Sequence, residues 1–291
     1  TYLYQLIGGK FKIPYIGYVQ NNIEAEIESC YSKGFKKLFR KIQLNFSIAA
    51  FQKAKALVFV CKALEDKSIE LGINPQNSII SYNPPVPDNP NLSFNSQAES
   101  WLKNSDLATF VCAARLEPQK DHETLLKAFA SAKQNQPNIR LILLGDGSLR
   151  NKLEDLSLFL GLSNHVLFLG NVSNPRAYFA LSRAVILVSH FEGLGIVLIE
   201  AVASGTTFIA TDCPFGPREI SEVLECGTLV QPQDTNDLAS AIISHTENPK
   251  ISIDRTEKLK IFSPDSCANR LTSLINSINK PKKNNASKNS F

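Results

Sequence analysis

The sequence predicts an α/β protein with two domains, each built on a parallel sheet, of which the first is incomplete. The chain of 291 residues is too long for one ordinary domain and suits two. From residue 107 onward, six short apolar segments alternate with segments of helical period. This alternation is typical of right-handed βαβ units whose sheet is covered on both faces.

The part of the chain before residue 84 predicts a smaller unit of the same kind. Apolar segments indicate strands at residues 13–19, 56–61 and 78–82. Helices are expected at residues 33–55 and 63–71, and Gly72 ends the second. The first helix has one apolar face, formed by Phe35, Leu38, Phe39, Ile42 and Phe46.

Four prolines within residues 84–90 exclude regular structure there and predict a stiff connector. After the connector, strands are expected at residues 107–114, 139–144, 166–169, 184–189, 207–210 and 228–230. Helices are expected at residues 122–134, 149–160, 175–182, 195–204, 217–223, 235–246 and 263–279. We therefore divide the chain into a partial N-terminal domain with linker (1–106), a ligand-binding domain (107–262), a final helix that packs back toward the first domain (263–279) and a disordered tail (280–291).

Composition limits the classes of function. A net charge of +4 gives no argument for nucleic-acid binding, and no segment reaches the roughly 18 apolar residues of a membrane span. The six cysteines are isolated, so we expect no metal site and free thiols in a reducing cytosol. We expect a cytoplasmic protein. The basic segment 33–41 is a candidate contact to anionic lipid on the inner face of the membrane, with a solvated amphipathic helix as the alternative.

Three segments follow predicted strands, where ligands bind in open parallel sheets. The first places Arg115 and Lys120 five residues apart after the strand at 107–114. Arginine offers a forked pair of donors to phosphate oxygens and lysine a point charge, so the pair suits a diphosphate. The alternative is a solvated loop with surface charges.

The second segment, Gly145-Asp146-Gly147-Ser148, predicts a tight turn in which Ser148 caps the next helix, and turn chemistry alone explains it. The third runs from Ser189 to Ala201 and opens a helix. Its two glycines, Gly193 and Gly195, let backbone N–H groups approach an anion. Glu192 stands in the loop, and Glu200, within the helix, is a candidate partner for ribose hydroxyls, with an exposed helical glutamate and a glycine turn as the alternative.

Together, Arg115 with Lys120, the Gly145–Gly147 turn, and the two glutamates within EGLGIVLIEAVASG resemble glycosyltransferase family 4, retaining group 1 glycosyl transferases of GT-B fold. The segment ATDCPFGPREI at residues 210–220 also resembles its bacterial members, which build surface polysaccharides. The resemblance is close over residues 107–260 and loose over 13–84. It implies two Rossmann-like domains facing a cleft. It also implies that the βα units expected before residue 13 are missing, so the first domain is incomplete.

The resemblance assigns roles to residues. Arg115 and Lys120 would hold the donor diphosphate, Glu200 the ribose hydroxyls, and Glu192 would lie near the donor sugar. The remaining donor-binding positions would be Gly145, Asn171, Val172, Gly193, Leu194, Gly195 and Ile196. A hexosyl group would move from a nucleotide-diphosphate sugar, such as a UDP- or GDP-sugar, to a saccharide or lipid-linked acceptor, with retention of configuration and without a cofactor.

One departure bears on this implied activity. The family commonly has a histidine after the strand at 13–19, where this chain has Gln20-Asn21-Asn22. Two other functions stay open: a non-catalytic nucleotide-binding remnant, because the acceptor half is incomplete, and a sugar-nucleotide epimerase of the same GT-B architecture.

Overall fold

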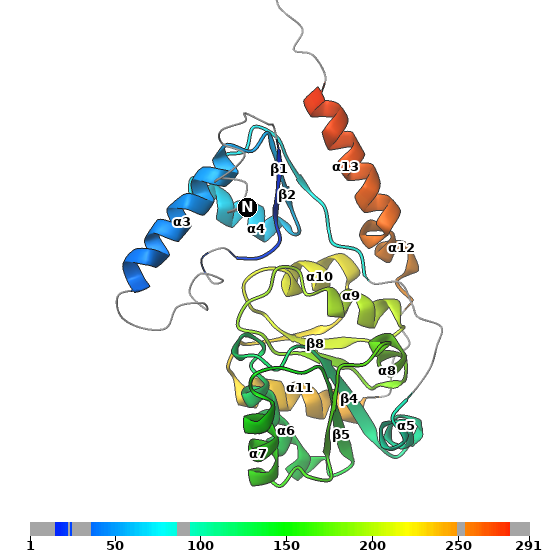
Figure 1. Cartoon of the computed structure of the whole chain (residues 1–291). Coiled ribbons are helices and arrows are strands. Elements are labelled where there is room, and N and C mark those ends of the chain that lie inside the picture. The colour runs from blue at the N-terminus through cyan, green and yellow to red at the C-terminus, as the bar shows by residue number, and fades with distance from the viewer. Residues whose placement is uncertain (1–14, 23, 25–35, 86–93, 249–253, 280–291) are drawn as a thin grey trace, which may run out of the picture.

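The computed structural model describes residues 15–22, 24, 36–85, 94–248 and 254–279 (Figure 1). It contains two parallel sheets, as predicted. The smaller has the order β1-β2-β3, formed by β1 (Ile16–Val19), β2 (Ala56–Phe59) and β3 (Ser78–Ile80). The larger has the order β6-β5-β4-β7-β8-β9, formed by β4 (Ala108–Ala113), β5 (Ile139–Leu144), β6 (Val166–Gly170), β7 (Val185–Leu187), β8 (Phe208–Thr211) and β9 (Thr228–Val230).

Helices connect the strands in the predicted alternation. In the first domain these are α3 (Lys36–Gln52) and α4 (Lys62–Glu70). In the second they are η1 (Pro118–Lys120), α6 (His122–Asn135), α7 (Arg150–Phe159), α8 (Pro175–Leu181), α9 (Ile196–Ala203), α10 (Pro217–Leu224) and α11 (Thr235–Glu247). The chain continues through α12 (Thr256–Leu259) and η2 (Lys260–Phe262) to α13 (Pro264–Asn279). The central strand β2 is fully buried, as its apolar sequence requires.

No element was predicted between the prolines of residues 84–90 and residue 107, where the structure has the helix α5 (Ser96–Lys103). Asn95 caps the helix, because its side chain accepts hydrogen bonds from the N–H groups of Gln97 and Ala98 at 3.1 and 3.2 Å. Ala98 and Trp101 then bury one face of α5. A local cap and one apolar face suffice for two helical turns beside a proline-rich segment.

The last helix contacts the first domain (Figure 1). Leu274 packs in a small apolar cluster with Ala56 and Val58 of β2. Arg270 donates a hydrogen bond to the carbonyl of Ile80 at 2.9 Å. α13 therefore covers one face of the small sheet after leaving the six-stranded domain.

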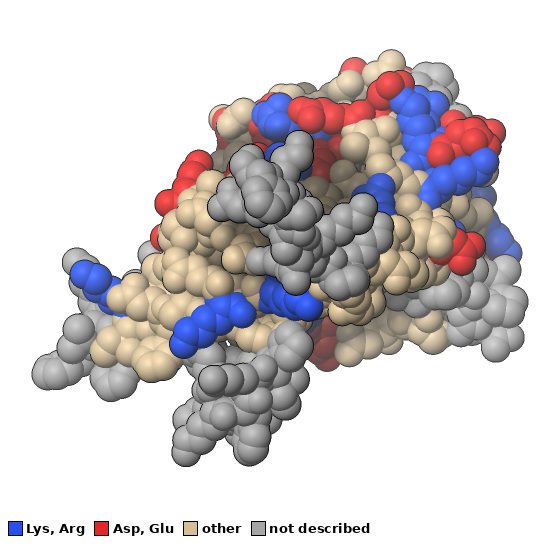
Figure 2. Space-filling model, turned by 90° about the horizontal axis from the view of Figure 1, so that it is seen from above, with Lys and Arg blue, Asp and Glu red and all other residues tan. Residues whose placement is uncertain are grey.

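The predicted basic helix exists as α3, but its side chains before residue 41 lie outside the described part of the structure. The proposed lipid contact therefore stays a prediction. Basic and acidic side chains are intermingled along the upper edge of the face seen in Figure 2. Within the described ranges, no helix is long and apolar enough to cross a membrane.

Candidate functional site

The order of the six-stranded sheet places a switch point between β4 and β7, which pair with each other at its centre. The chain leaves β4 toward one edge and β7 toward the other, and in open parallel sheets ligands bind outside the carboxyl ends of the strands at such a point. The segments that follow these two strands are hydrogen-bonded together. His190 donates its backbone N–H to the Gln119 carbonyl at 2.9 Å, and the Gln119 side chain donates to the Phe191 carbonyl at 2.8 Å.

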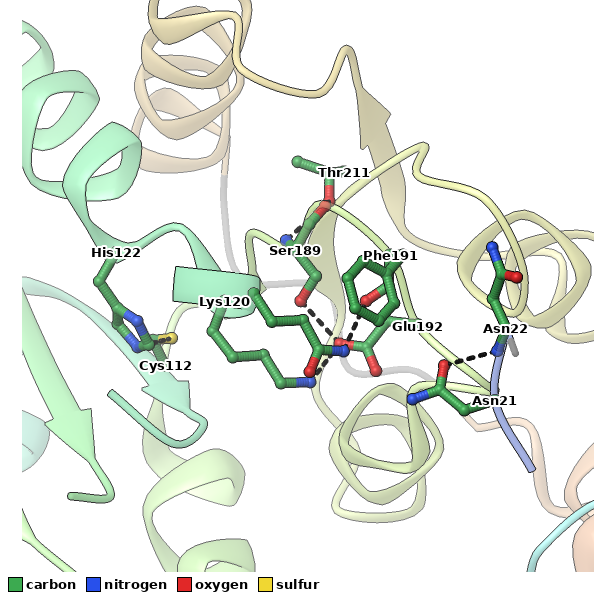
Figure 3. A network of polar contacts seen from close by, with 10 residues as sticks. Asn21, Asn22, Cys112, Lys120, His122, Ser189, Phe191, Glu192 and Thr211 are labelled. Atoms are coloured by element: carbon green, nitrogen blue, oxygen red, sulfur yellow. Dashed lines mark hydrogen bonds and ion pairs between the residues drawn. The ribbon is translucent and has the colours of Figure 1, made fainter. Parts of the chain in front are cut away.

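At this point Lys120 and Glu192 form an ion pair (Figure 3). Their side chains are only 15% and 8% exposed. Ser189 donates its hydroxyl to the same Glu192 carboxylate oxygen, Oε1, at 2.6 Å. Thr211 on β8 in turn donates to the Ser189 carbonyl at 2.8 Å. Three neighbouring strands thus hold one buried pair of opposite charges at the switch point.

Arg115 is not part of this pair. It is exposed and, within the described ranges, its guanidinium makes no hydrogen bond or ion pair. Its neighbour Glu117 accepts hydrogen bonds from the Ser148 N–H and hydroxyl at 2.8 and 2.7 Å. These bonds, and more weakly the Arg115 charge, lower the pKa of Glu117. Ser148 therefore ties the two loops together instead of capping α7, where the N-cap position is Leu149.

The Gly145–Gly147 turn packs on the backbone of the Arg115 loop. Gly145 has φ of +130°, and a Cβ there would lie 2.1 Å from the Ala114 carbonyl oxygen. A Cβ at Gly147 would lie 2.5 Å from the Leu116 carbonyl oxygen. The structure gives these glycines a positioning role, because only residues without a side chain allow the two loops to approach so closely. Direct donor contact by Gly145 stays a prediction.

The segment after β7 opens α9 as predicted. Gly195 occupies the N-cap with φ of +83°, and Leu194 is buried. The N–H of Leu198 already donates to the Gly195 carbonyl at 2.9 Å, so the N–H groups of Ile196 and Val197 are the candidates for contact with an anion. Ile196 and Glu200 lie on the half-exposed face of α9. This half-exposed face was not recognised in the sequence, because the residues on either side of Glu200 are apolar.

Asn171 and Val172 follow β6, the edge strand of the large sheet. Asn171 is exposed, and Val172 packs against the main core. Two strands, β5 and β4, separate them from β7, so these residues are not brought into the Lys120–Glu192 cluster. A nucleobase contact at this place stays a prediction.

The segment after β1 meets the Glu192 loop from the first domain. A Cβ at Gly193 would lie 1.9 Å from the Gln20 carbonyl oxygen and 3.5 Å from the Asn21 Cα. Cys61 also donates its thiol to the Gly193 carbonyl at 3.2 Å. The residues that stand where the family has a histidine are therefore at the site (Figure 3). The only sequence signal for this contact was a glycine directly after Glu192.

A second domain contact involves Glu219 on α10. Its carboxylate accepts the backbone N–H of Lys62 at 2.8 Å and the Tyr82 hydroxyl at 2.8 Å. It thereby satisfies an N-terminal donor of α4, whose own N-cap residue Cys61 provides no side-chain cap. Burial, followed by the bond to Glu219, raises the pKa of Tyr82.

His122 begins α6, two residues after Lys120, and is 1% exposed. Its Nε2 lies 3.7 Å from the Cys112 sulfur, and its buried Nδ1 makes no hydrogen bond with the described residues. Burial, with a smaller contribution from the Lys120 charge, lowers the pKa of His122 to about 4. The imidazole is therefore neutral at pH 7.

This burial predicts a loss of stability in mild acid. Between pH 6.5 and 4 the unfolded chain binds a proton at His122 that the folded chain does not, so stability is full above 6.5 and falls as pH drops. The expected loss from pH 7 to pH 5 is about 2 kcal/mol. Urea unfolding of the parent and of His122→Phe measures it, and the variant should lose clearly less over this interval. An equal loss in both proteins would contradict the assignment.

No three histidine, cysteine, aspartate or glutamate side chains within the described ranges are arranged to hold a metal ion. The two parallel sheets, together with the matching solved structures, define the GT-B class of glycosyltransferase fold. Among solved structures, sucrose-phosphate synthase from Thermosynechococcus elongatus matches with a TM-score of 0.74 and 20% identity, over 95% of this chain and 72% of that one. A Staphylococcus aureus TarM mutant crystallised with UDP matches with a TM-score of 0.71 and 18% identity, over 90% of this chain and 51% of that one.

The chain belongs to the glycosyl transferases group 1 family, whose model matches residues 93–261. An uncharacterized glycosyltransferase of Methanocaldococcus jannaschii is 38% identical over 128 residues, which cover 43% of this chain and 32% of the relative. A Campylobacter jejuni protein is 31% identical over 188 residues, which cover 65% of this chain and 49% of the relative. It is named N-acetylgalactosamine-N,N'-diacetylbacillosaminyl-diphospho-undecaprenol 4-alpha-N-acetylgalactosaminyltransferase. The matched segments thus span about a third to a half of the length of these relatives.

Proposed function

We propose that this chain carries the donor-binding site of a retaining glycosyltransferase. The enzyme would move a hexosyl group from a nucleotide-diphosphate sugar to a saccharide or lipid-linked acceptor in surface polysaccharide or glycoconjugate synthesis. The buried Lys120–Glu192 pair at the switch point carries the proposal. The names of the relatives support it: the Campylobacter protein is a sugar transferase named for a diphospho-undecaprenol acceptor, and TarM was crystallised with UDP.

In the reaction, the bond from the anomeric carbon to a phosphate oxygen breaks, and a bond to the acceptor oxygen forms on the same face. The departing phosphate takes the acceptor proton, so no protein base is needed. The Lys120 ammonium has three donors, of which Glu192 engages one, and the others are available to the phosphate. Arg115, exposed beside the crevice, would supply a forked pair of donors. These cations stabilise the charge that develops on the leaving diphosphate.

Glu192 has two tasks in this scheme. It holds Lys120 in place, and both its hydrogen bonds from Lys120 and Ser189 go to Oε1. Its second oxygen, Oε2, would accept from a hydroxyl of the donor sugar. Glu200, on the half-exposed face of α9, would accept from the ribose hydroxyls.

Calorimetric titration with UDP, GDP and ADP tests the proposal. We expect one nucleotide to bind, and Arg115→Ala to weaken its binding by about 10- to 100-fold, because hydrogen bonds to a charged group are lost. The matched control is Arg183→Ala, just before β7, where the guanidinium donates to the Asn248 carbonyl at 2.9 Å and to no other group among the described residues. That variant should bind like the parent. If the folded chain binds none of the nucleotides, the nucleotide-dependent proposal is wrong.

A further inference from the structure

Gln119 directly precedes Lys120 and is half-buried in the short helix η1. Two hydrogen bonds join it to the segment that leads into Glu192. Its backbone carbonyl accepts the N–H of His190 at 2.9 Å, and its side-chain amide Nε2 donates to the carbonyl of Phe191 at 2.8 Å. None of the roles assigned above falls on Gln119. The residues just before the two members of the ion pair are thus bonded to each other.

The side-chain bond from Gln119 acts on the peptide unit from which Glu192 projects. In a planar trans peptide the C=O and N–H groups point in opposite directions. The carbonyl of this unit, which belongs to Phe191, accepts from Gln119. Its N–H, which belongs to Glu192, donates to the Pro214 carbonyl at 3.3 Å. One hydrogen bond on each side therefore fixes the plane of this peptide, and with it the direction in which the Glu192 side chain leaves the backbone.

The position of the Lys120 ammonium depends on that direction. Lysine carries its charge on a flexible four-carbon stem, so the partner of the charge decides where it lies. Here the partner is Oε1 of Glu192, which lies beside Phe191 and Lys120 in Figure 3. A rotation of the Phe191–Glu192 peptide would displace the carboxylate, and the ammonium would move with it.

We propose that Gln119 is a positioning residue for the donor diphosphate: through the Phe191–Glu192 peptide it holds the Lys120 ammonium against the leaving phosphate. The proposal rests on the proposed function, in which Lys120 contacts that phosphate. It requires an amide at position 119. A glutamate side chain has the same length, but its carboxylate cannot donate to a carbonyl and would add a negative charge beside Lys120. Methionine has a similar size and offers no N–H or O–H donor.

A comparison of nucleoside diphosphates with monophosphates on the 291-residue chain tests this role. The phosphate that leaves the sugar is the second one of the nucleotide, and a monophosphate lacks it. The probes are UDP, GDP and ADP with UMP, GMP and AMP, measured by calorimetric titration and, where binding is weak, by saturation-transfer NMR. Gln119→Met should weaken diphosphate binding about tenfold, because a misplaced ammonium loses hydrogen bonding to the second phosphate. The affinity for the monophosphate should stay unchanged.

Gln136→Met is the matched control. Gln136 follows the far end of α6, where its side-chain amide donates to the Glu247 carboxylate at 3.0 Å. The same substitution therefore removes an amide hydrogen bond from the same domain, away from the switch point, and this variant should bind both nucleotides like the parent. Gln119→Glu keeps the test valid if Gln119→Met fails to fold, and it should weaken diphosphate binding at least as much.

Three results would overturn the positioning role alone. One is an equal loss of diphosphate and monophosphate binding in the Gln119 variants, which would show a general structural role. The second is diphosphate binding in these variants as tight as in the parent. The third is a parent chain that binds the two nucleotides equally tightly. A folded parent chain that binds no nucleotide contradicts the proposed function instead.

Discussion

Lys120→Ala is expected to destabilise the six-stranded domain by about 3–5 kcal/mol, because it leaves the Glu192 carboxylate buried without its cation. Among the described residues, the Glu192 carboxylate then retains only the hydrogen bond from the Ser189 hydroxyl to Oε1, at 2.6 Å. The variant should also lower sugar transfer by about 10²- to 10³-fold, since an electrostatic stabiliser of the leaving group is gone. Both effects are large because the pair is only 15% and 8% exposed.

Urea unfolding followed by tryptophan fluorescence measures the stability effect. The single tryptophan, Trp101, is 9% exposed on α5 and accepts a hydrogen bond at its carbonyl from Thr109 of β4, so it reports on this domain. The matched control is Lys127→Ala, which removes an exposed ion pair to Glu123 at 2.8 Å and should cost less than about 1 kcal/mol.

A double-mutant cycle measures the interaction free energy between Lys120 and Glu192. Replacing both Lys120 and Glu192 removes both buried charges, so the double variant should be more stable than Lys120→Ala alone. Additive losses would show that the two side chains do not interact, and would remove the geometric basis of the proposed site.

Gly193→Ala is expected to open the contact between the domains and to lower transfer by about 100-fold. Its Cβ would lie 1.9 Å from the Gln20 carbonyl oxygen, which is backbone and cannot rotate away. Either the domains must separate or the Glu192 loop must shift. A displacement of about 1 Å near the reacting groups lowers the rate of transfer by about 100-fold. Small-angle scattering with bound nucleotide, together with transfer assays, measures both consequences.

Gly205→Ala is the control for this substitution. Gly205 has φ of +77°, and no atom lies within 4 Å of the position that a Cβ would take, so alanine brings local strain of about 1 kcal/mol without a clash. Its scattering curve and transfer rate should match the parent. If Gly193→Ala also behaves like the parent, the contact between Gln20 and Gly193 has no part in bringing the domains together.

The local pattern of apolar residues was sufficient to predict most of the fold. The six strands of the second domain and the helices between them follow from apolar segments and helical period, which depend on neighbours in the chain. Helix α5 was missed, because its proline- and asparagine-rich surroundings hide it. Its apolar residues, Ala98, Trp101 and Leu102, lie on one helical face, and Phe94 just before the helix packs its ring 5.0 Å from that of Tyr178 on α8.

The sequence by itself determined the class of fold, the type of most elements and the residues to examine, because backbone preference and hydrophobic pattern are local properties. Only the tertiary structure decided which residues meet. Lys120 and Glu192 are 72 positions apart and touch because β4 and β7 pair at the switch point. Gly193 and Gln20 meet across two domains. Such contacts depend on strand order and domain packing, which no local pattern encodes.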